Sequence, residues 1–149
     1  MSGSRRTVAD MWSQRSVIDY ALARRATLAD LFTGRASTLD VCDAHPYLLR
    51  AAKHHGEPTE EQCPVCRKER LTHVTYAYGE ELGESSGRTF ASRSVARIAA
   101  EYAEVAIYVV EVCRGCGWNH LTTSFVVGHG KVPERAGTAR RARRSVAPD

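Results

Sequence analysis

The stretches that decide the fold are "CPVC" at residues 63–66 and "CRGCGW" at residues 113–118. In each of them two cysteines stand three positions apart, so one turn of the chain directs two thiolates toward the same metal ion. Two such turns complete the four-ligand shell of a tetrahedral zinc site. We therefore expect one structural Zn2+ ion. Its ligands are Cys63, Cys66, Cys113 and Cys116.

Strand patterns flank both cysteine pairs. The stretch "LTHVTYAYG" at 71–79 is typical of a strand, and "EVAIYVVEV" at 104–112 is apolar on both faces, as a central strand would be. The stretch "WNHLTTSFVV" at 118–127 alternates. Its inward residues are expected to be Leu121, Thr123, Phe125 and Val127. With one pair before the first strand and the other between the second and third, the pattern predicts a three-stranded antiparallel zinc ribbon.

The separation of the two pairs departs from the usual ribbon. Residues 67–112 lie between them, which is 112 − 66 = 46 positions, whereas about 15–20 is usual. A loop at 80–88 and a helix at 89–103, inserted between the two metal-binding turns, account for the excess. Two other interpretations are a chance pair of unrelated turns and a redox-active Cys-x-x-Cys motif in a thioredoxin-like frame. The flanking hairpin strands favour a metal site over both.

The part of the chain before the first pair is expected to be helical. An apolar stripe at helical spacing runs from Val17 to Leu22, and a second short helix is expected to stop at Gly34. A third helix is expected to carry Pro46 in its first turn and to be capped by Asp43.

These patterns together predict an α+β fold, in which an N-terminal helical segment precedes the ribbon. The expected segments are a disordered N-terminus (1–13), a helical region (14–56), the zinc-ribbon domain with its inserted helix (57–128) and a disordered basic tail (129–149).

The formal net charge of +4 is located entirely near the C-terminus. Residues 131–149 hold six basic and two acidic groups, 6 − 2 = +4, so residues 1–130 sum to zero. A flexible polycation binds phosphates without regard to sequence, and the tail therefore offers non-specific contact with nucleic acid. The residues expected to make it are Arg140, Arg141, Arg143 and Arg144.

The N-terminus carries two arginines without an apolar segment behind them, so no secretory signal is expected. The sequence contains no run of 18 apolar residues, so no membrane-spanning helix is expected. We expect a cytoplasmic protein with no membrane contact. In that reducing compartment five cysteines indicate metal binding rather than a disulfide framework.

Two further residues near the pairs could take part in the site. Cys42 stands alone before a helix, where a cysteine is more often a small core group than a ligand. His120 lies four positions past Cys116 and could replace a thiolate, although four cysteines already fill the shell.

The chain resembles a small actinobacterial family of unknown function with a predicted zinc ribbon. The resemblance spans residues 14–128 and rests on three stretches: "VCDAHPYLLRAAKHHGEP", "CPVCRKERLTHVTYAYGEELG" and "VVEVCRGCGWNHLTTSFVVG". It implies a cytosolic setting and zinc on the four paired cysteines, and it brings no activity.

The expected function is that of a non-catalytic interaction module for the transcription or translation machinery. Because the body is neutral by count, contact with a protein is favoured over direct reading of DNA. The alternative is a thiol-based redox or metal sensor, in which Cys42 would act as a resolving thiol. Four cysteines leave a zinc ion no open position, and no nucleophile–base pair or phosphate-binding motif is present, so neither catalysis nor a small-molecule substrate is expected.

Overall fold

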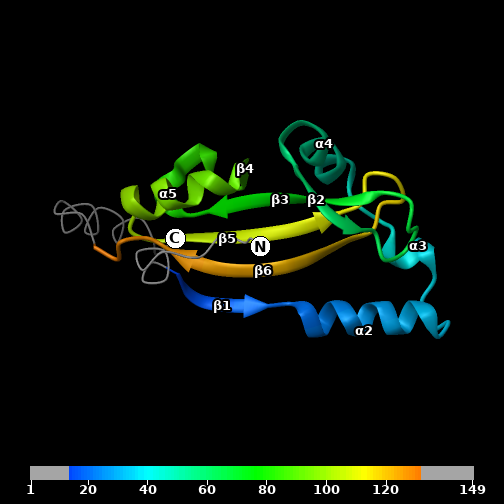
Figure 1. Ribbon diagram of the computed structural model, residues 1–149. Coiled ribbons are helices and arrows are strands. Elements are labelled where there is room, and N and C mark those ends of the chain that lie inside the picture. The colour runs from blue at the N-terminus through cyan, green and yellow to red at the C-terminus, as the bar shows by residue number, and fades with distance from the viewer. Residues whose placement is uncertain (1–13, 132–149) are drawn as a thin grey trace, which may run out of the picture.

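The computed structural model describes residues 14–131, so the expected disordered segment 1–13 and the four tail arginines lie outside the described residues. Six strands form one antiparallel sheet in the order β1–β6–β5–β3–β2, with β4 beside β3 (Figure 1). The strands are β1 (Arg15–Asp19), β2 (Glu57–Gln62), β3 (Arg70–Tyr78), β4 (Arg88–Phe90), β5 (Val105–Val112) and β6 (Asn119–Val127). The α-helices are α2 (Ala21–Phe32), α3 (Thr38–Val41), α4 (Pro46–His55) and α5 (Val95–Glu101).

The centre of the sheet confirms the three strands expected from the sequence. β3 pairs with β5 without interruption from Thr72↔Val112 to Tyr78↔Ala106, and β5 pairs with β6 along its whole length. The predicted three-stranded ribbon has too few strands, because the sheet contains six. β1 is added to β6 on one side of these strands, and β2 and β4 are added to β3 on the other.

The N-terminal part is not wholly helical, which corrects the expected helical segment. Residues 15–19 form a strand, and Ile18 pairs with Ser124 of β6. The apolar residues Val17 and Ile18 fit a helical stripe in the sequence, yet they are 54% and 50% exposed. The two helices expected before Gly34 are one helix, α2, and a short α3 follows it. Tertiary pairing with β6 has therefore overridden the local pattern.

The third expected helix is confirmed as α4, with Pro46 at its first position. Its cap is not Asp43 but His45, whose Nδ1 accepts a hydrogen bond from the backbone N–H of Tyr47 at 3.1 Å. The helix expected at 89–103 is shorter than predicted, because residues 88–90 form β4 and a 3-10 turn at Ser92–Ser94 precedes α5. The loop at 80–88 contains a second 3-10 segment, Glu80–Ser85.

Helices cover opposite faces of the sheet at its two ends. α5 packs Ile98 and Ala99 against Ala77 and Ile107, whereas α4 packs Ala52 against Val74 and Val112. Since side chains alternate along a strand, Ile107 and Val112 of β5 point to opposite faces. α2 and α3 lie at the end away from α5 (Figure 1), where they pack on the paired cysteines.

A bulge in β6 corrects the prediction of its inward face. Val109 pairs with Thr123 while the next residue, Val110, pairs with Leu121, so Thr122 is an extra residue. Leu121 consequently faces the side opposite to Thr123 and Phe125.

Among the described residues, no helix has the length and apolar character needed to cross a membrane.

Candidate metal centre

The first cysteine turn, residues 63–68, joins β2 to β3. We call it the first knuckle. The backbone N–H of Val65 donates to Sγ of Cys63 and that of Lys68 to Sγ of Cys66, both at 3.4 Å. The turn is closed by a hydrogen bond from the Arg67 N–H to the Cys63 carbonyl at 3.1 Å. Arg67 adopts a φ of +58°, a left-handed conformation that is costly for a residue with a Cβ.

The second knuckle, residues 113–118, joins β5 to β6 and has a similar geometry, closed by a hydrogen bond from the Gly117 N–H to the Cys113 carbonyl at 2.9 Å. The N–H of Cys116 donates to Sγ of Cys113 at 3.3 Å and that of Trp118 to Sγ of Cys116 at 3.4 Å. Gly117 occupies the place of Arg67, with a φ of +94°. A Cβ on Gly117 would lie 2.9 Å from the Cys42 carbonyl oxygen, so close packing as well as φ requires glycine here.

The two knuckles bring the four cysteines together at one end of the sheet. Their Sγ atoms all lie within 4.8 Å of one another, and the group can hold a metal ion. The Sγ atoms of Cys63 and Cys116 are 3.8 Å apart, and those of Cys66 and Cys113 are 3.7 Å apart. Four sulfurs at about 2.3 Å from a tetrahedral ion are about 3.8 Å from each other. The residues present therefore fit such an ion.

Burial and backbone hydrogen bonds act differently on the four thiols. The Lys68 N–H, which donates to its sulfur, lowers the pKa of Cys66 to about 7. Burial raises the pKa of Cys116 to about 12 and also raises the pKa values of Cys63 and Cys113. Burial thus favours the neutral thiol at Cys63, Cys113 and Cys116. A metal cation favours the thiolate instead, because it ionises the thiols that coordinate it.

A fifth thiol touches the group. Cys42, between α3 and α4, directs its S–H toward Sγ of Cys116 at 3.6 Å. The same segment is tied to the second knuckle by the Ala44 N–H, which donates to the Gly117 carbonyl at 3.0 Å. The sequence offers no local signal for this contact, since residues 42 and 116 are 74 positions apart.

Trp118 connects the second knuckle to a buried ion pair that sequence reasoning missed. Its indole Nε1–H donates to the Glu111 carboxylate at 2.7 Å, and the same oxygen accepts from Nε of Arg24 at 2.7 Å. The Glu111 side chain is 3% exposed, so without these donors its charge would be buried unpaired. Arg24 also bridges to the exposed Glu61 at 3.2 Å. These contacts therefore connect α2 and β2 to the end of the sheet that carries the four paired cysteines, which we call the metal end.

His120 does not join the cysteine group. Its ring stacks on Trp118 with centroids 5.9 Å apart, and its Nδ1 is 2.8 Å from the Leu121 carbonyl oxygen. The metal-ligating group found in residues 14–131 consists of the four paired cysteines alone.

Fold and site define an α+β protein with a four-cysteine site at the end of an antiparallel sheet. Residues 11–143 match the family of unknown function DUF5318, and the chain belongs to that family. It is 47% identical over 129 residues to uncharacterized protein Mb0050 of Mycobacterium bovis and to uncharacterized protein Rv0049 of Mycobacterium tuberculosis. Each match covers 85% of this chain and 94% of the relative. The expected kinship with a small actinobacterial family is thus confirmed. No solved structure gives a significant match to the chain.

Proposed function

We propose that the chain is a non-catalytic interaction module built around one structural Zn2+ ion on Cys63, Cys66, Cys113 and Cys116. The observation that carries the proposal is that four thiols meet on two turns whose backbone N–H groups donate to the sulfurs. Soft thiolates in tetrahedral geometry select zinc or iron–sulfur centres. A closed four-thiolate shell leaves zinc no position for a substrate, which is the property of a structural site.

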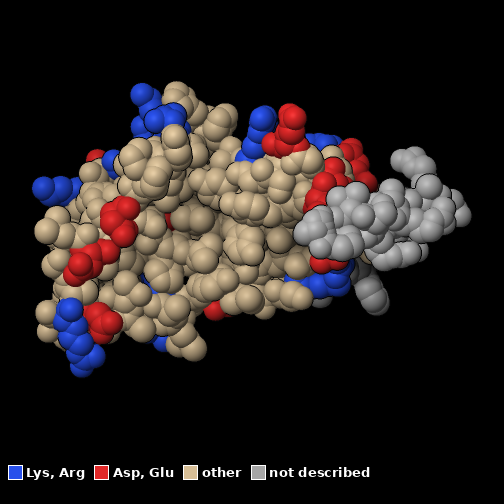
Figure 2. Space-filling model, turned by 180° about the vertical axis from the view of Figure 1, so that it is seen from behind, with Lys and Arg blue, Asp and Glu red and all other residues tan. Residues whose placement is uncertain are grey.

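The surface of the sheet supports contact with a protein. On the face that carries α4, Tyr78 is 47% exposed and meets the ring of Tyr108 edge-on, with centroids 5.6 Å apart. Figure 2, seen from behind, shows charged side chains mainly at the margins of the molecule and few at its centre. An exposed tyrosine that packs on a half-buried one, on a surface with few charges, is a composition favoured at protein interfaces. The partner we propose is a component of the transcription or translation machinery.

Cross-linking in cells followed by mass spectrometry tests this partner. A subunit of RNA polymerase or of the ribosome should be enriched with the native chain and lost with a Tyr78→Ala, Tyr108→Ala double variant. Leu22→Ala, at a residue 72% exposed on α2, is the matched control and should retain it. Enrichment that the tyrosine variant leaves unchanged, or that contains no such subunit, would contradict the proposal. Elemental analysis of the same preparations should give one zinc per chain.

The contact between Cys42 and Cys116 favours a second candidate, a peroxide sensor. Hydrogen peroxide can take two electrons from the Cys42 thiol and the Cys116 thiolate. A disulfide forms, and the thiol hydrogen and one proton from solvent complete two water molecules. The metal ion thereby loses one ligand. Zinc release on addition of peroxide should be slower in Cys42→Ser than in the native chain, and equal rates would eliminate this candidate.

A further inference from the structure

The neutral charge of residues 1–130 conceals an uneven distribution. Cations follow the cysteines of both knuckles: Arg67 and Lys68 in the first, and Arg114 in the second. Arg70 stands at the start of β3. Three of these cations, Lys68, Arg70 and Arg114, lie around a hollow of about 590 Å³, which we call the knuckle hollow. Its lining residues are Lys68, Glu69, Arg70, Thr72, Arg114 and Gly115.

Two of the cations in the knuckle hollow are available to a ligand. Lys68 and Arg114 are exposed, and neither forms an ion pair with any residue in the range 14–131. Arg70 is partly committed, because it meets Glu60 at 3.1 Å in a pair exposed on both sides. Among the lining residues there is one carboxylate, that of Glu69, and the Glu69 side chain lies against Gly115. Its net formal charge is therefore 3 − 1 = +2.

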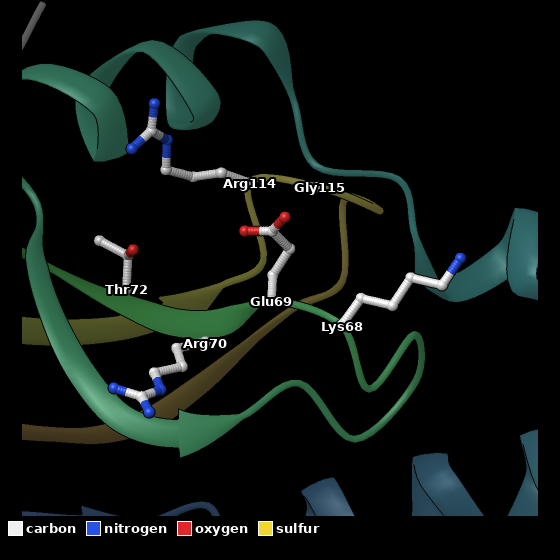
Figure 3. Close-up of a pocket in the computed structure, with 6 residues that line it drawn as sticks. All are labelled: Lys68, Glu69, Arg70, Thr72, Arg114 and Gly115. Atoms are coloured by element: carbon white, nitrogen blue, oxygen red, sulfur yellow. The ribbon is translucent and has the colours of Figure 1, made fainter.

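The positions of these cations indicate a polyanion rather than a single small anion. Figure 3 shows that Arg114 extends toward α4, that Arg70 turns to the opposite side and that Lys68 lies apart from both. They stand around the hollow instead of converging on one point. Cations placed in this way suit successive charges along a chain. The lining contains no large apolar side chain, so it offers no pocket for the apolar anchor that a peptide partner commonly supplies.

α4, whose ribbon lies beside the Arg114 guanidinium in Figure 3, carries further cations and an exposed ring. Its last turn carries Lys53, His54 and His55 and no acidic residue. Tyr47 in its first turn is 68% exposed, and the Arg50 guanidinium lies 5.1 Å from the centre of its ring. An exposed aromatic ring beside cations provides a stacking surface for an unpaired base.

From this arrangement we infer that the knuckle hollow and α4 bind the sugar–phosphate backbone of a single-stranded nucleic acid. Lys68 and Arg114 contact phosphates, and Tyr47 stacks on a base. This contact goes beyond the proposed protein contact and does not depend on it, since the two use different residues. It also differs from contact through the C-terminal tail, because it places cations on turns that are closed by backbone hydrogen bonds.

The test uses the full-length, zinc-loaded chain and a fluorescein-labelled single-stranded oligonucleotide of about 15 nucleotides, with anisotropy measured over a series of salt concentrations. In Lys68→Gln, Arg114→Gln the affinity at low salt should fall about tenfold. The log–log salt slope should decrease by about 1.4, since each phosphate contact of a single strand contributes about 0.7. Arg88→Gln, Arg93→Gln removes the same charge from exposed residues near α5 and should change little.

The Tyr47 contact has its own readout. Tyr47→Ala should weaken binding of the single strand at least fivefold and leave binding of a duplex of the same sequence unchanged. Tyr47→Phe, which keeps the ring, should restore single-strand affinity. Equal losses on both oligonucleotides would contradict stacking and overturn the assignment of a single strand.

Three results would overturn the inference. Equal losses in the knuckle variant and in the α5 variant would show that net charge alone drives binding. A zinc content that falls in parallel with oligonucleotide affinity would assign the cations to balancing the negative charge of the thiolate centre. Binding of poly-glutamate as tight as that of the oligonucleotide, with the same loss in the knuckle variant, would place an acidic protein on this surface.

Discussion

The two ends of the sheet differ in what fills the space between its strands and the covering helices. At the α5 end the core cluster is apolar, and its members Ile98, Val105 and Ile107 are at most 1% exposed. At the metal end, Cys63 and Cys113 are as deeply buried as Leu71 and Trp118. The α5 end therefore derives its stability from apolar burial, whereas the metal end has polarisable thiols where a core would have hydrocarbon. Under the proposed structural ion, one sheet combines an end stabilised by apolar burial with an end whose stability depends on the metal.

Removal of the metal should separate the two ends most clearly. The free energy of zinc binding to such sites is on the order of 10 kcal/mol and contributes directly to folding. With a chelator, hydrogen exchange should show loss of protection in both knuckles and in α2, which packs on them through Leu28 and Leu31. Amides of β5 near Ile107 should retain protection longer. A uniform loss along the chain would show that the ends are one cooperative unit.

A substitution at the α5 end should give the reverse result. Ile98→Ala removes buried methyl groups from a residue that is 1% exposed, and such a change costs about 2–5 kcal/mol. Denaturant unfolding of the zinc-loaded protein measures this loss. Zinc per chain should stay the same as in the native protein. If zinc content falls with stability, the metal end depends on the apolar end.

The buried ion pair tests how α2 is held to the metal end. Glu111→Gln removes the charge that faces Arg24 while keeping an acceptor for the indole of Trp118. We expect a loss of about 1–3 kcal/mol, because Arg24 is 23% exposed on its side chain and can turn to solvent. Glu60→Gln, in an exposed pair with Arg70, is the control and should cost at most about 1 kcal/mol. Equal effects would show that burial adds nothing to the Glu111 contact.

The smallest expected effect compares the two knuckles with each other. Gly117→Ala places a Cβ at positive φ against the Cys42 carbonyl and should cost about 1–2 kcal/mol. Arg67→Gly relieves the same backbone conformation in the first knuckle and should be neutral or slightly stabilising. Thermal unfolding of the two zinc-loaded variants measures both. A loss in Arg67→Gly equal to that in Gly117→Ala would show that the Arg67 side chain supports the turn.

Local patterns were sufficient for the parts of the site that are local in the chain. The spacing of each cysteine pair specifies its knuckle, and the apolar runs around them specify β3, β5 and β6. β2 was missed because "EPTEEQ" is mostly exposed and contains Pro58, so it shows no buried face. β1 was missed because its apolar residues are exposed and its pairing partner lies more than a hundred residues away.

Contacts between distant residues could not be predicted from the sequence either. The metal end is completed by Arg24 meeting Glu111 and by Cys42 meeting Cys116, and neither pair has a periodicity or a spacing that identifies it. The knuckle hollow is formed in the same way. Lys68 and Arg114 are 46 positions apart, 114 − 68 = 46, and they lie around one hollow because their knuckles share one site.

The pairing of β1 with β6 has a consequence for the order in which a ribosome delivers the chain. Arg15 is made 111 residues before its partner Val126, since 126 − 15 = 111. The first knuckle likewise presents two thiolates long before Cys113 and Cys116 exist to close the shell. Contacts between such distant residues form late, because the intervening chain must first be ordered. The nascent chain therefore carries one cysteine pair without the other while residues 67–112 are made, and β1 can pair only once β6 has been made.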